Sequence, residues 1–452
     1  MTGFKATLIG GLMMTAGAAM ASAPVTSIRP ESRAAIVERV TAQPVVFVVG
    51  TSVRPTIRPA RNATVTQGAS VVTQEQISTS NIGFQRWIDG FRQRAMAQGI
   101  TGATLDKAFR NARYNADAIS RDRNQSEFTK TLWDYLDSAV SDSRISNGKA
   151  ALREHAAKLD RIEAKYGVEK EVVVAVWGLE SAYGAVRGKT EVIPAMATLA
   201  YDGRRGAFFE EQLIAALKIL QNGDTNVQGM TGSWAGAMGH TQFMPTSYLD
   251  YAQDFNGDGR RDIWSDDPTD ALASTANYLK RFGWVKGMPW GVEVQLPQGF
   301  DYALADRKIT KMPNQWGRLG VRGLDGKAVP THGSASILLP AGSQGVALMI
   351  CRKCSVMERY NAADAYVIGG GHLSDRIVGK RGCQATWPRG DRALKSAERK
   401  ELQQRLTRAG FSTQGVDGRI GPNTIAAIRS YQKARGLTPD GYPSLTLLQK
   451  LR

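Results

Sequence analysis

One carboxylate in the sequence stands where acid catalysis would need it. Glu180 closes an almost entirely apolar run, Val172–Leu179, that would share a helical face with it. Removing a carboxylate from water raises its pKa, because the charged form loses its solvation. A glutamate kept protonated near neutral pH can donate a proton to a glycosidic oxygen. The alternative is an ordinary surface glutamate that pairs with Arg187 or Lys189.

The glycine-containing segment after this run, 184–190, looks like a phosphate-binding loop but departs from the pattern. Gly184 and Gly188 are separated by three residues, where nucleotide binding requires four, and Tyr183 stands where the pattern requires glycine. The segment also follows a predicted helix rather than a strand, so its amides would not be arranged to cradle phosphates. We interpret it as a helix exit.

An acidic loop follows the calcium-binding EF-hand pattern through its ninth position. Oxygen-bearing side chains occupy positions 1, 3, 5 and 9. Gly259 provides the turn at position 6, and Arg260 at position 7 would contribute only its backbone carbonyl. Position 12 is Ser265 instead of glutamate. A bound calcium ion and a turn that needs no metal are both consistent with this loop, whose four oxygen-bearing side chains are Asp254, Asn256, Asp258 and Asp262.

The three cysteines allow three kinds of site. Cys351 and Cys354, with His372 and Cys383 downstream, could form a zinc site or a redox pair. In an exported protein one structural disulfide plus a leftover thiol is favoured, and the sequence does not show which two sulfurs pair.

The first residues predict export. Lys5 precedes a short apolar run, Leu8–Ala19, and small residues follow through Ala23, the pattern of a secretory signal peptide. Cleavage after Ala21 is favoured, which makes 1–21 the signal peptide. No cysteine lies near this position, which argues against a lipoprotein, so no stable membrane anchor is expected.

Long segments that position the candidate residues have helical periodicity. Residues 22–82 read as a disordered or extended linker. From Phe84 onward apolar residues recur at helical spacing, and strand-like segments appear between residues 288 and 350. The fold class predicted is mostly α, with a small β-containing insertion. Helical stretches are expected at 84–91, 132–135, 150–166, 168–184, 204–220 and 270–282, strands at 292–296 and 335–339, a linker at 379–392, and a small helical unit from 393.

Composition and charge narrow the class of partner. The 452 residues allow about three domains, and the formal net charge is +17. No window holds 18 uninterrupted apolar residues, which excludes a multi-spanning membrane protein. Residues 379–452 carry +10 and residues 83–378 only +3. A basic excess predicts a polyanionic partner; export disfavours nucleic acid and favours an anionic cell envelope.

Three further motifs carry a family resemblance. Trp177–Gly184, Gly232–Tyr248 and Ala276–Leu279 together resemble the B-type lytic murein transglycosylases, over roughly residues 83–375. The resemblance implies a catalytic region at 83–378 with a lysozyme-like helical core. It also implies cleavage of the MurNAc–GlcNAc β-1,4 bond of peptidoglycan glycan strands without water, which leaves a 1,6-anhydro-MurNAc end. Glu180 would be the acid and then the base, and the N-acetyl group of the substrate would stabilise the intermediate.

The same resemblance assigns substrate-binding residues. Ser233 and Gln242 match positions that hydrogen-bond the sugar, although both could serve only as turn or capping residues in their glycine-rich loop. Tyr278 matches a pocket tyrosine but has the spacing of a core residue. Ala363 stands where the family usually has serine, so one supporting hydrogen bond is lost. The segment 359–366 is similar to the family segment that lines the cleft through Tyr360, Asn361 and Tyr366.

The resemblance also supplies a closing ligand for the acidic loop. That ligand is the acidic residue that opens the next helix, Asp270, which follows a two-residue insertion relative to the family. A calcium ion bound there would stabilise the wall of the cleft and perform no chemistry, so no cofactor is expected for catalysis.

The basic tail resembles a three-helix peptidoglycan-binding domain over residues 393–452. Its Asp417-Gly418, Gly421-Pro422-x-Thr424 and Tyr431-Gln432 elements carry the resemblance, and the segment holds 11 basic and 4 acidic residues. The alternative is a solvated basic face that binds nothing.

The sequence therefore predicts a periplasmic, wall-associated lytic transglycosylase. Two alternatives remain open, a muramidase that hydrolyses the same bond and a catalytically inactive wall-binding or scaffold protein. Anhydro ends, reducing ends or no release of fragments would distinguish the three.

Overall fold

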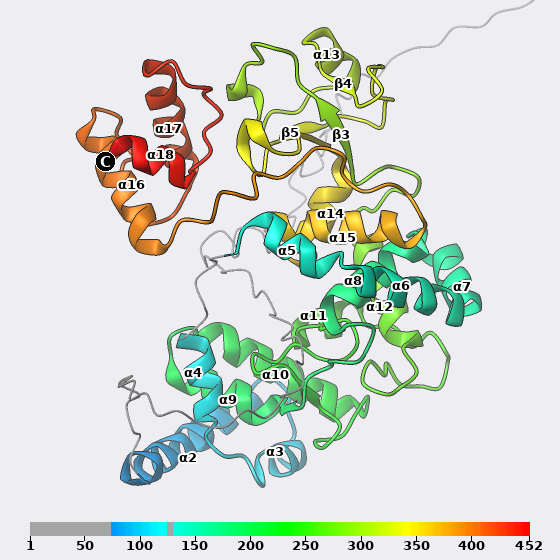
Figure 1. The fold of residues 1–452 in the computed structure, drawn as a ribbon. Helices are drawn as coiled ribbons and strands as arrows, with labels where there is room; N and C mark the ends of the chain where they lie inside the picture. The colour runs from blue at the N-terminus through cyan, green and yellow to red at the C-terminus, as the bar shows by residue number, and fades with distance from the viewer. Residues whose placement is uncertain (1–73, 124–129) are drawn as a thin grey trace, which may run out of the picture. The chain divides into compact units, whose positions relative to one another are not determined.

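Most of the described chain is helical, as the spacing of its apolar residues predicts. The computed structural model describes residues 74–123 and 130–452 (Figure 1). The chain divides into two units: Met1–Val46 lies outside the described residues, and everything below belongs to Phe47–Arg452. The helices that precede the larger sheet are α2 (Gln74–Met96), α3 (Gly102–Phe109), α4 (Ala116–Arg123), α5 (Leu132–Ala139), α6 (Asp142–Glu154), α7 (Ala156–Tyr166), α8 (Lys170–Ser181), α9 (Val192–Asp202), α10 (Gly206–Asn222), α11 (Pro245–Tyr251) and α12 (Thr269–Arg281).

Helix α8 runs through the largest hydrophobic core. Every residue from Val172 to Gly178 is buried. Helices α6 and α15 (Asp364–Ile377) pack against α8, and α15 also packs against α5 and α14 (Arg352–Tyr360). Glu180 lies in the last turn of α8, so packing on several sides of this helix determines where its carboxylate points.

A four-stranded antiparallel sheet forms the β-containing insertion. Its strand order is β4-β3-β6-β5, and in its centre Val292 of β3 pairs with Met349 of β6. A separate small core lies here around Trp316, which is fully buried on α13 (Pro313–Arg318). Two short strands, β1 (Thr190–Glu191) and β2 (Thr231–Gly232), pair elsewhere, beside the exit of α8. The four strands of the sheet are β3 (Gly291–Gln295), β4 (Arg322–Gly323), β5 (Ser336–Leu338) and β6 (Leu348–Ile350).

The C-terminal three-helix unit has a core of its own. It consists of α16 (Ser396–Arg408), α17 (Pro422–Ala434) and α18 (Leu445–Leu451), at the orange-to-red end of the chain in Figure 1. Proline is favoured at the first helical position because its missing N–H would have no partner there, and Pro422 opens α17 in this way. Two glutamines inside the unit repeat one arrangement: Gln403 accepts the amide of Gly418, and Gln432 accepts the amide of Gly441, each at 2.8 Å.

The predicted mostly helical fold class with a small β insertion and a C-terminal three-helix unit is confirmed, with local differences. The stretch 150–166 is interrupted at His155, between α6 and α7. Helix α9 was not predicted, because its side chains are buried nearly all round and leave no polar face to give a period. Helix α15 contains Gly369–Gly371, which disfavours helix locally; a Cβ at Gly371 would lie 2.2 Å from Trp290.

The N-terminal predictions are only partly covered by the structure. Helix α2 begins at Gln74, so the end of the range predicted as a linker, 22–82, is helical instead. The helix continues backward from the apolar stripe that starts at Phe84. The signal peptide at 1–21 and the linker up to residue 73 lie outside the described residues. Among the described residues, no helix is both long enough and apolar enough to cross a membrane.

The expected disulfide is not formed in the structure, where all three cysteines are free thiols. Cys351 packs into the core of the β insertion, whereas Cys354, three residues later, packs into the large helical core. Cys383 packs against that helical core from the linker after α15. Side chains committed to separate cores explain why the short spacing does not produce a bond.

Candidate active site

Glu180 is partly buried at the C-terminal end of α8 and accepts one hydrogen bond from a tyrosine. The hydroxyl of Tyr366, on α15, donates to Glu180 Oε1 at 2.7 Å. Burial raises the pKa of Glu180 to about 8, and the hydrogen bond from Tyr366 opposes that rise because it stabilises the charged form. The negative end of the α8 dipole also disfavours a charge here. Glu180 is therefore mostly protonated at pH 7, as an acid catalyst requires.

The backbone is strained directly beside this carboxylate. Ala182 and Tyr183 have φ of 52° and 60°, and Gln242 has φ of 53°. In the described chain only one further non-glycine residue, Gln414, has positive φ. Such conformations cost free energy and persist where the surrounding structure holds them, most often at functional sites.

The predicted sugar-binding residues of the glycine-rich loop lie close to the exit of α8. Gln242 Nε2 donates to the carbonyl oxygens of Arg187, at 3.0 Å, and Gly239, at 2.8 Å. Ser233 Oγ accepts the amide of Ala237 at 3.1 Å, which is the turn-stabilising contact expected of a serine here. The Ser233 hydroxyl hydrogen remains available for a ligand.

The predicted aromatic residues form one group with Glu180 at its edge. The rings of Tyr360 and Tyr366 stack with centroids 6.4 Å apart, and Tyr278 packs edge-on against Tyr360 at 5.1 Å. Tyr360 donates to the carbonyl of Thr241, and Tyr278 to that of Arg359. Tyr278 is only 8% exposed, so it supports Tyr360 from the core side.

Asn361 caps the end of α14. Its side-chain oxygen accepts the amide of Ala363 at 3.1 Å, so this backbone amide already has a partner although the family's serine is missing at that position. The structure therefore brings Tyr366 onto Glu180 directly and places Asn361 beside the Tyr360 end of the group.

The sequence reasoning missed three residues near the acid. Tyr135 on α5 has its pKa raised by burial and then by the nearby charge of Glu180. Arg144 on α6 donates to the carbonyl of Gly178, in the last turns of α8. Both come from helices that precede α8 by many residues, so no spacing in the sequence could have indicated them.

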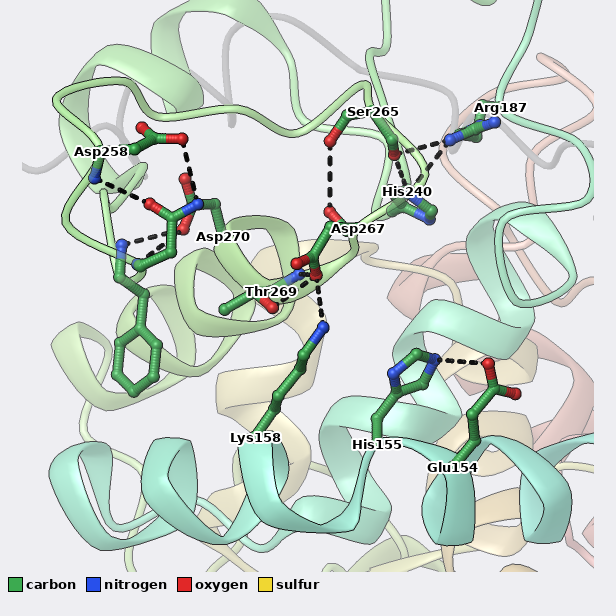
Figure 2. A network of polar contacts seen from close by, with 12 residues as sticks. Glu154, His155, Lys158, Arg187, His240, Asp258, Ser265, Asp267, Thr269 and Asp270 are labelled. Carbon is green, nitrogen blue, oxygen red and sulfur yellow. Dashed lines mark hydrogen bonds and ion pairs between the residues drawn. The ribbon is translucent and has the colours of Figure 1, made fainter.

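His240 is the third missed residue and packs against Trp177 of α8. Trp177 Nε1 donates to His240 Nδ1 at 3.1 Å, so the ring carries its hydrogen on Nε2, which lies 2.7 Å from the carbonyl of Ser265. Figure 2 shows His240 and Arg187 meeting this carbonyl together. Burial, and then the charge of Arg187, lower the pKa of His240, so the ring stays neutral.

The predicted calcium loop folds as a turn whose oxygens accept backbone amides. Asp254 accepts the amides of Gly257, Asp258 and Gly259, an arrangement that holds the loop closed. Asn256 donates to Asp258 at 3.1 Å, and the amide of Arg260 also bonds Asp258.

Asp270 lies at the start of α12 and holds the loop through backbone amides (Figure 2); its role as a calcium ligand stays a prediction. Its Oδ1 accepts the amides of Phe255 and Asn256, and its Oδ2 accepts that of Asp262. Burial is the main cause of its raised pKa. Oxygen donors of this kind suit a hard cation, but across 74–123 and 130–452 no three His, Cys, Asp or Glu side chains converge on one point as metal ligands.

The zinc alternative finds no support in the same region. Cys351, Cys354, Cys383 and His372 are not brought together as a ligand group within the described chain. Both ring nitrogens of His372 are buried without a hydrogen-bond partner.

The helical core buries a protonated glutamate, Glu180, against Tyr366, and a small three-helix unit follows it. This combination is typical of enzymes that cleave glycans and carry a separate binding module. Residues 83–375 match the family described as Transglycosylase SLT domain, and residues 395–451 match a peptidoglycan binding domain family. The first match covers more than half of the chain, and the protein belongs to the transglycosylase SLT family.

Similar proteins agree with this assignment. The chain is 47% identical to SltB3 from Pseudomonas aeruginosa, solved with NAG-anhNAM-pentapeptide; the match has a TM-score of 0.79 and covers 82% of this chain and 99% of that one. Escherichia coli Slt35, solved with calcium, is 29% identical at a TM-score of 0.55, over 66% and 93% of the chains. The predicted lysozyme-like fold is thereby confirmed.

One curated relative is the membrane-bound lytic murein transglycosylase B of Escherichia coli K12. It is 39% identical over 172 residues, which are 37% of this chain. The match spans about half of the relative, 47% of its length.

Proposed function

We propose that the protein is a lytic transglycosylase that cleaves the MurNAc–GlcNAc β-1,4 bond of peptidoglycan and leaves a 1,6-anhydro-MurNAc end. The observation that carries this proposal is the carboxyl of Glu180, whose pKa is raised to about 8 by burial and which Tyr366 orients. Two effects shift this pKa, burial of the carboxyl and the hydrogen bond from the Tyr366 hydroxyl, and neither comes from a second carboxylate. Ordinary glycosidases use two carboxylates, and substrate assistance is the recognised exception.

In this reaction Glu180 first gives its proton to the glycosidic oxygen as the bond from that oxygen to C1 breaks. The acetamido oxygen of the substrate stabilises the positive charge that develops at C1. The C6 hydroxyl of the same sugar then attacks C1, and Glu180 takes its proton. The carboxyl ends in its initial protonated state, so no water and no cofactor is consumed.

The remaining predicted residues would hold the sugar chain. Ser233 has a hydroxyl hydrogen to donate, and Gln242 has a side-chain oxygen that can accept from the substrate. Tyr360 and Asn361 would line the wall next to Tyr366, and Tyr278 would support Tyr360.

Product analysis tests the proposal. Purified sacculi are digested with the wild-type protein, and the fragments are identified by mass spectrometry; anhydro-muramyl ends are expected. Glu180→Gln should release these ends far more slowly than wild type, while Glu171→Gln, on the same helix, serves as the matched control and should behave as wild type. Reducing ends would indicate a muramidase, and wall binding without release would indicate an inactive scaffold protein.

We also propose that the loop of Asp254, Asn256, Asp258, Arg260 and Asp262, closed by Asp270, binds a structural calcium ion. The donor types support this, as does the calcium present in the related Slt35 structure. Adding calcium should raise the midpoint of thermal unfolding by several degrees.

The matched variants for this loop are Asp258→Asn and Asp142→Asn. The first should abolish the calcium shift, and the second, an exposed acid on α6, should keep it. An unchanged midpoint in wild type, with magnesium as a second control, would leave the loop as an amide-closed turn.

We further propose that the protein acts at the cell wall after export, with its C-terminal unit binding the wall. The basic composition of that unit and the residues of the predicted signal peptide support this. Fractionation of cells, with sequencing of the mature N-terminus, tests it; a cytoplasmic protein that keeps Met1 would contradict it.

A further inference from the structure

The segment that leaves α8 carries one arginine with an unusual set of partners. The guanidinium of Arg187 donates through Nη1 to the carbonyls of Trp264, at 3.0 Å, and Ser265, at 2.7 Å. Its Nη2 meets the carboxylate of Asp266 at 2.7 Å. Asp266 is 98% exposed, so this ion pair is screened by water and the two carbonyl contacts are the ones that hold the side chain.

The backbone of the same arginine holds Gln242. The carbonyl oxygen of Arg187 accepts one Gln242 Nε2–H, and the carbonyl of Gly239 accepts the other. Both hydrogens of the amide are therefore used inside the protein. A side-chain amide has two donor hydrogens and one acceptor oxygen, so Gln242 Oε1 is the atom left for a ligand.

We propose that Arg187 is a positioning residue that fixes Gln242, so that Gln242 Oε1 accepts an N–H or O–H of the bound sugar. The proposal rests on the proposed function, because the sugar is its substrate. Arg187 itself touches no reacting atom. It acts by fastening the strained turn that carries Gln242 to the segment 264–266.

That segment is itself well anchored, which is what makes it a support. Asp262 Oδ1 accepts the amides of Trp264 and Ser265, and Trp264 Nε1 donates to the carbonyl of Thr231. Two side chains join this segment to the turn of Gln242: Arg187, and His240, whose Nε2 lies 2.7 Å from the carbonyl of Ser265.

The glycine spacing after α8 now has a physical explanation. Gly188 follows Arg187 with φ of 87°, and a Cβ there would lie 2.2 Å from the carbonyl of Gly232. Close backbone contact between the helix exit and β2 places the Arg187 carbonyl beside the turn of Gln242. The segment 184–190, which resembles a phosphate-binding loop, thus supplies a carbonyl that holds the side-chain amide of Gln242.

Lysine could not replace the arginine fully. A guanidinium presents several N–H groups in a fixed fork, whereas an ammonium is a single point on a flexible chain. Arg187→Lys keeps the charge but should hold the carbonyls of Trp264 and Ser265 less firmly. Arg187→Lys is a milder change than Arg187→Ala, so a KM increase in this variant would not be explained by misfolding.

The experiment measures kcat and KM on soluble, uncross-linked peptidoglycan strands. We expect KM to rise about tenfold in Arg187→Ala and about threefold in Arg187→Lys, with kcat within twofold and an unchanged pH profile. Affinity for the same strands, measured in the Glu180→Gln background, should fall by the same factors. Arg261→Lys, in the acidic loop just before the segment 264–266, is the matched control: Arg261 pairs with Asp224, so KM should stay at the wild-type value.

A double-mutant cycle separates positioning from direct binding. If Arg187 acts through Gln242, Arg187→Ala combined with Gln242→Ala should be no worse than Gln242→Ala alone. Additive losses, or an unchanged KM in Arg187→Ala, would overturn the proposal. These outcomes presuppose that wild type cleaves the strands; a wild type that binds but does not cleave contradicts the proposed function and leaves the affinity cycle to test Arg187.

Discussion

The end of α8 and the C-terminal three-helix unit differ in how their buried polar groups are stabilised. Around Glu180 a carboxyl is held protonated, and Ala182 and Tyr183 have strained backbones. In the C-terminal unit the buried Gln403 and Gln432 have their hydrogen bonds satisfied by neighbouring loops. The comparison teaches that the end of α8 keeps a carboxyl protonated for chemistry, whereas the C-terminal unit satisfies its buried amides and presents a charged surface.

The largest expected effect breaks the first region. Glu180→Gln should lower the rate of fragment release by about 10²- to 10⁴-fold, the range typical of losing a positioned acid or base. The release of soluble fragments from sacculi measures it. Residual activity near that of wild type would contradict the assignment of the acid.

The same substitution should stabilise the fold. The folded-state pKa of Glu180, about 8, is above its unfolded value of 4.5, so its contribution is present below pH 4.5 and is lost as pH rises through 8. Glutamine does not ionise, and the variant should gain roughly 3 kcal/mol in unfolding free energy at pH 7, about 1.4 kcal/mol for each pH unit above 4.5. Urea unfolding at pH 4 and pH 7 tests this; an equal difference at both values would contradict it.

Activity should fall as pH rises through about 8, because the acid loses its proton. The hydrogen bond from Tyr366 lowers this pKa, so Tyr366→Phe should move the alkaline limb of the pH profile upward while reducing the rate. Profiles of kcat/KM compare the two proteins. Tyr302→Phe, on the β insertion, is the matched control and should leave the limb in place.

The basic surface of the C-terminal unit is expected to matter only for binding to the wall. Replacing Lys400, Arg408 and Lys433 with glutamine should weaken binding to sacculi several-fold at low salt, since such contacts are screened by ions. Cleavage of soluble fragments should be unchanged. The control replaces exposed Arg86, Arg110 and Arg113 in the same way; equal losses from both sets would contradict the division.

The smallest expected effect concerns backbone strain at one position in each of the two regions. Ala182 and Gln414 share a left-handed backbone, with φ of 52° and 58°. Glycine at either position should relieve strain and raise the unfolding free energy by about 0.5–1 kcal/mol. Thermal unfolding measures this. Ala182→Gly should also reduce activity, because the exit of α8 loosens beside Glu180, whereas Gln414→Gly should not.

The core of the catalytic helices could be read from the sequence because local pattern and final burial agree. The apolar run before Glu180 became α8, and the spacing at Phe84 became part of α2. The prediction was weakest where the environment is uniform. Helix α9 has no polar face to give a period. In α15 the three glycines leave room for side chains from elsewhere in the fold: Tyr135 at Gly369, Met357 at Gly370 and Trp290 at Gly371.

The site, too, could be predicted only where the neighbours of a residue are close to it in sequence. The apolar surroundings of Glu180 were enough to predict a raised pKa, because desolvation depends on neighbours that are close in sequence. The neighbours that orient the acid come from far away: Tyr366 lies 186 residues later, and Tyr135 belongs to α5. A disulfide was expected because export was predicted, yet all three cysteines are free, and Cys351 and Cys354 pack into different cores.

By itself the sequence determined the type of chemistry, the family resemblance, the acidic loop and the separation of the basic tail, because residue type, spacing and charge are written along the chain. Only the tertiary structure decided which groups meet. It brought Tyr366 to Glu180, joined Arg187 to both Gln242 and the segment 264–266, and left the three cysteines as free thiols. Contacts of this kind depend on how helices pack, and packing sums many weak interactions that no local pattern records.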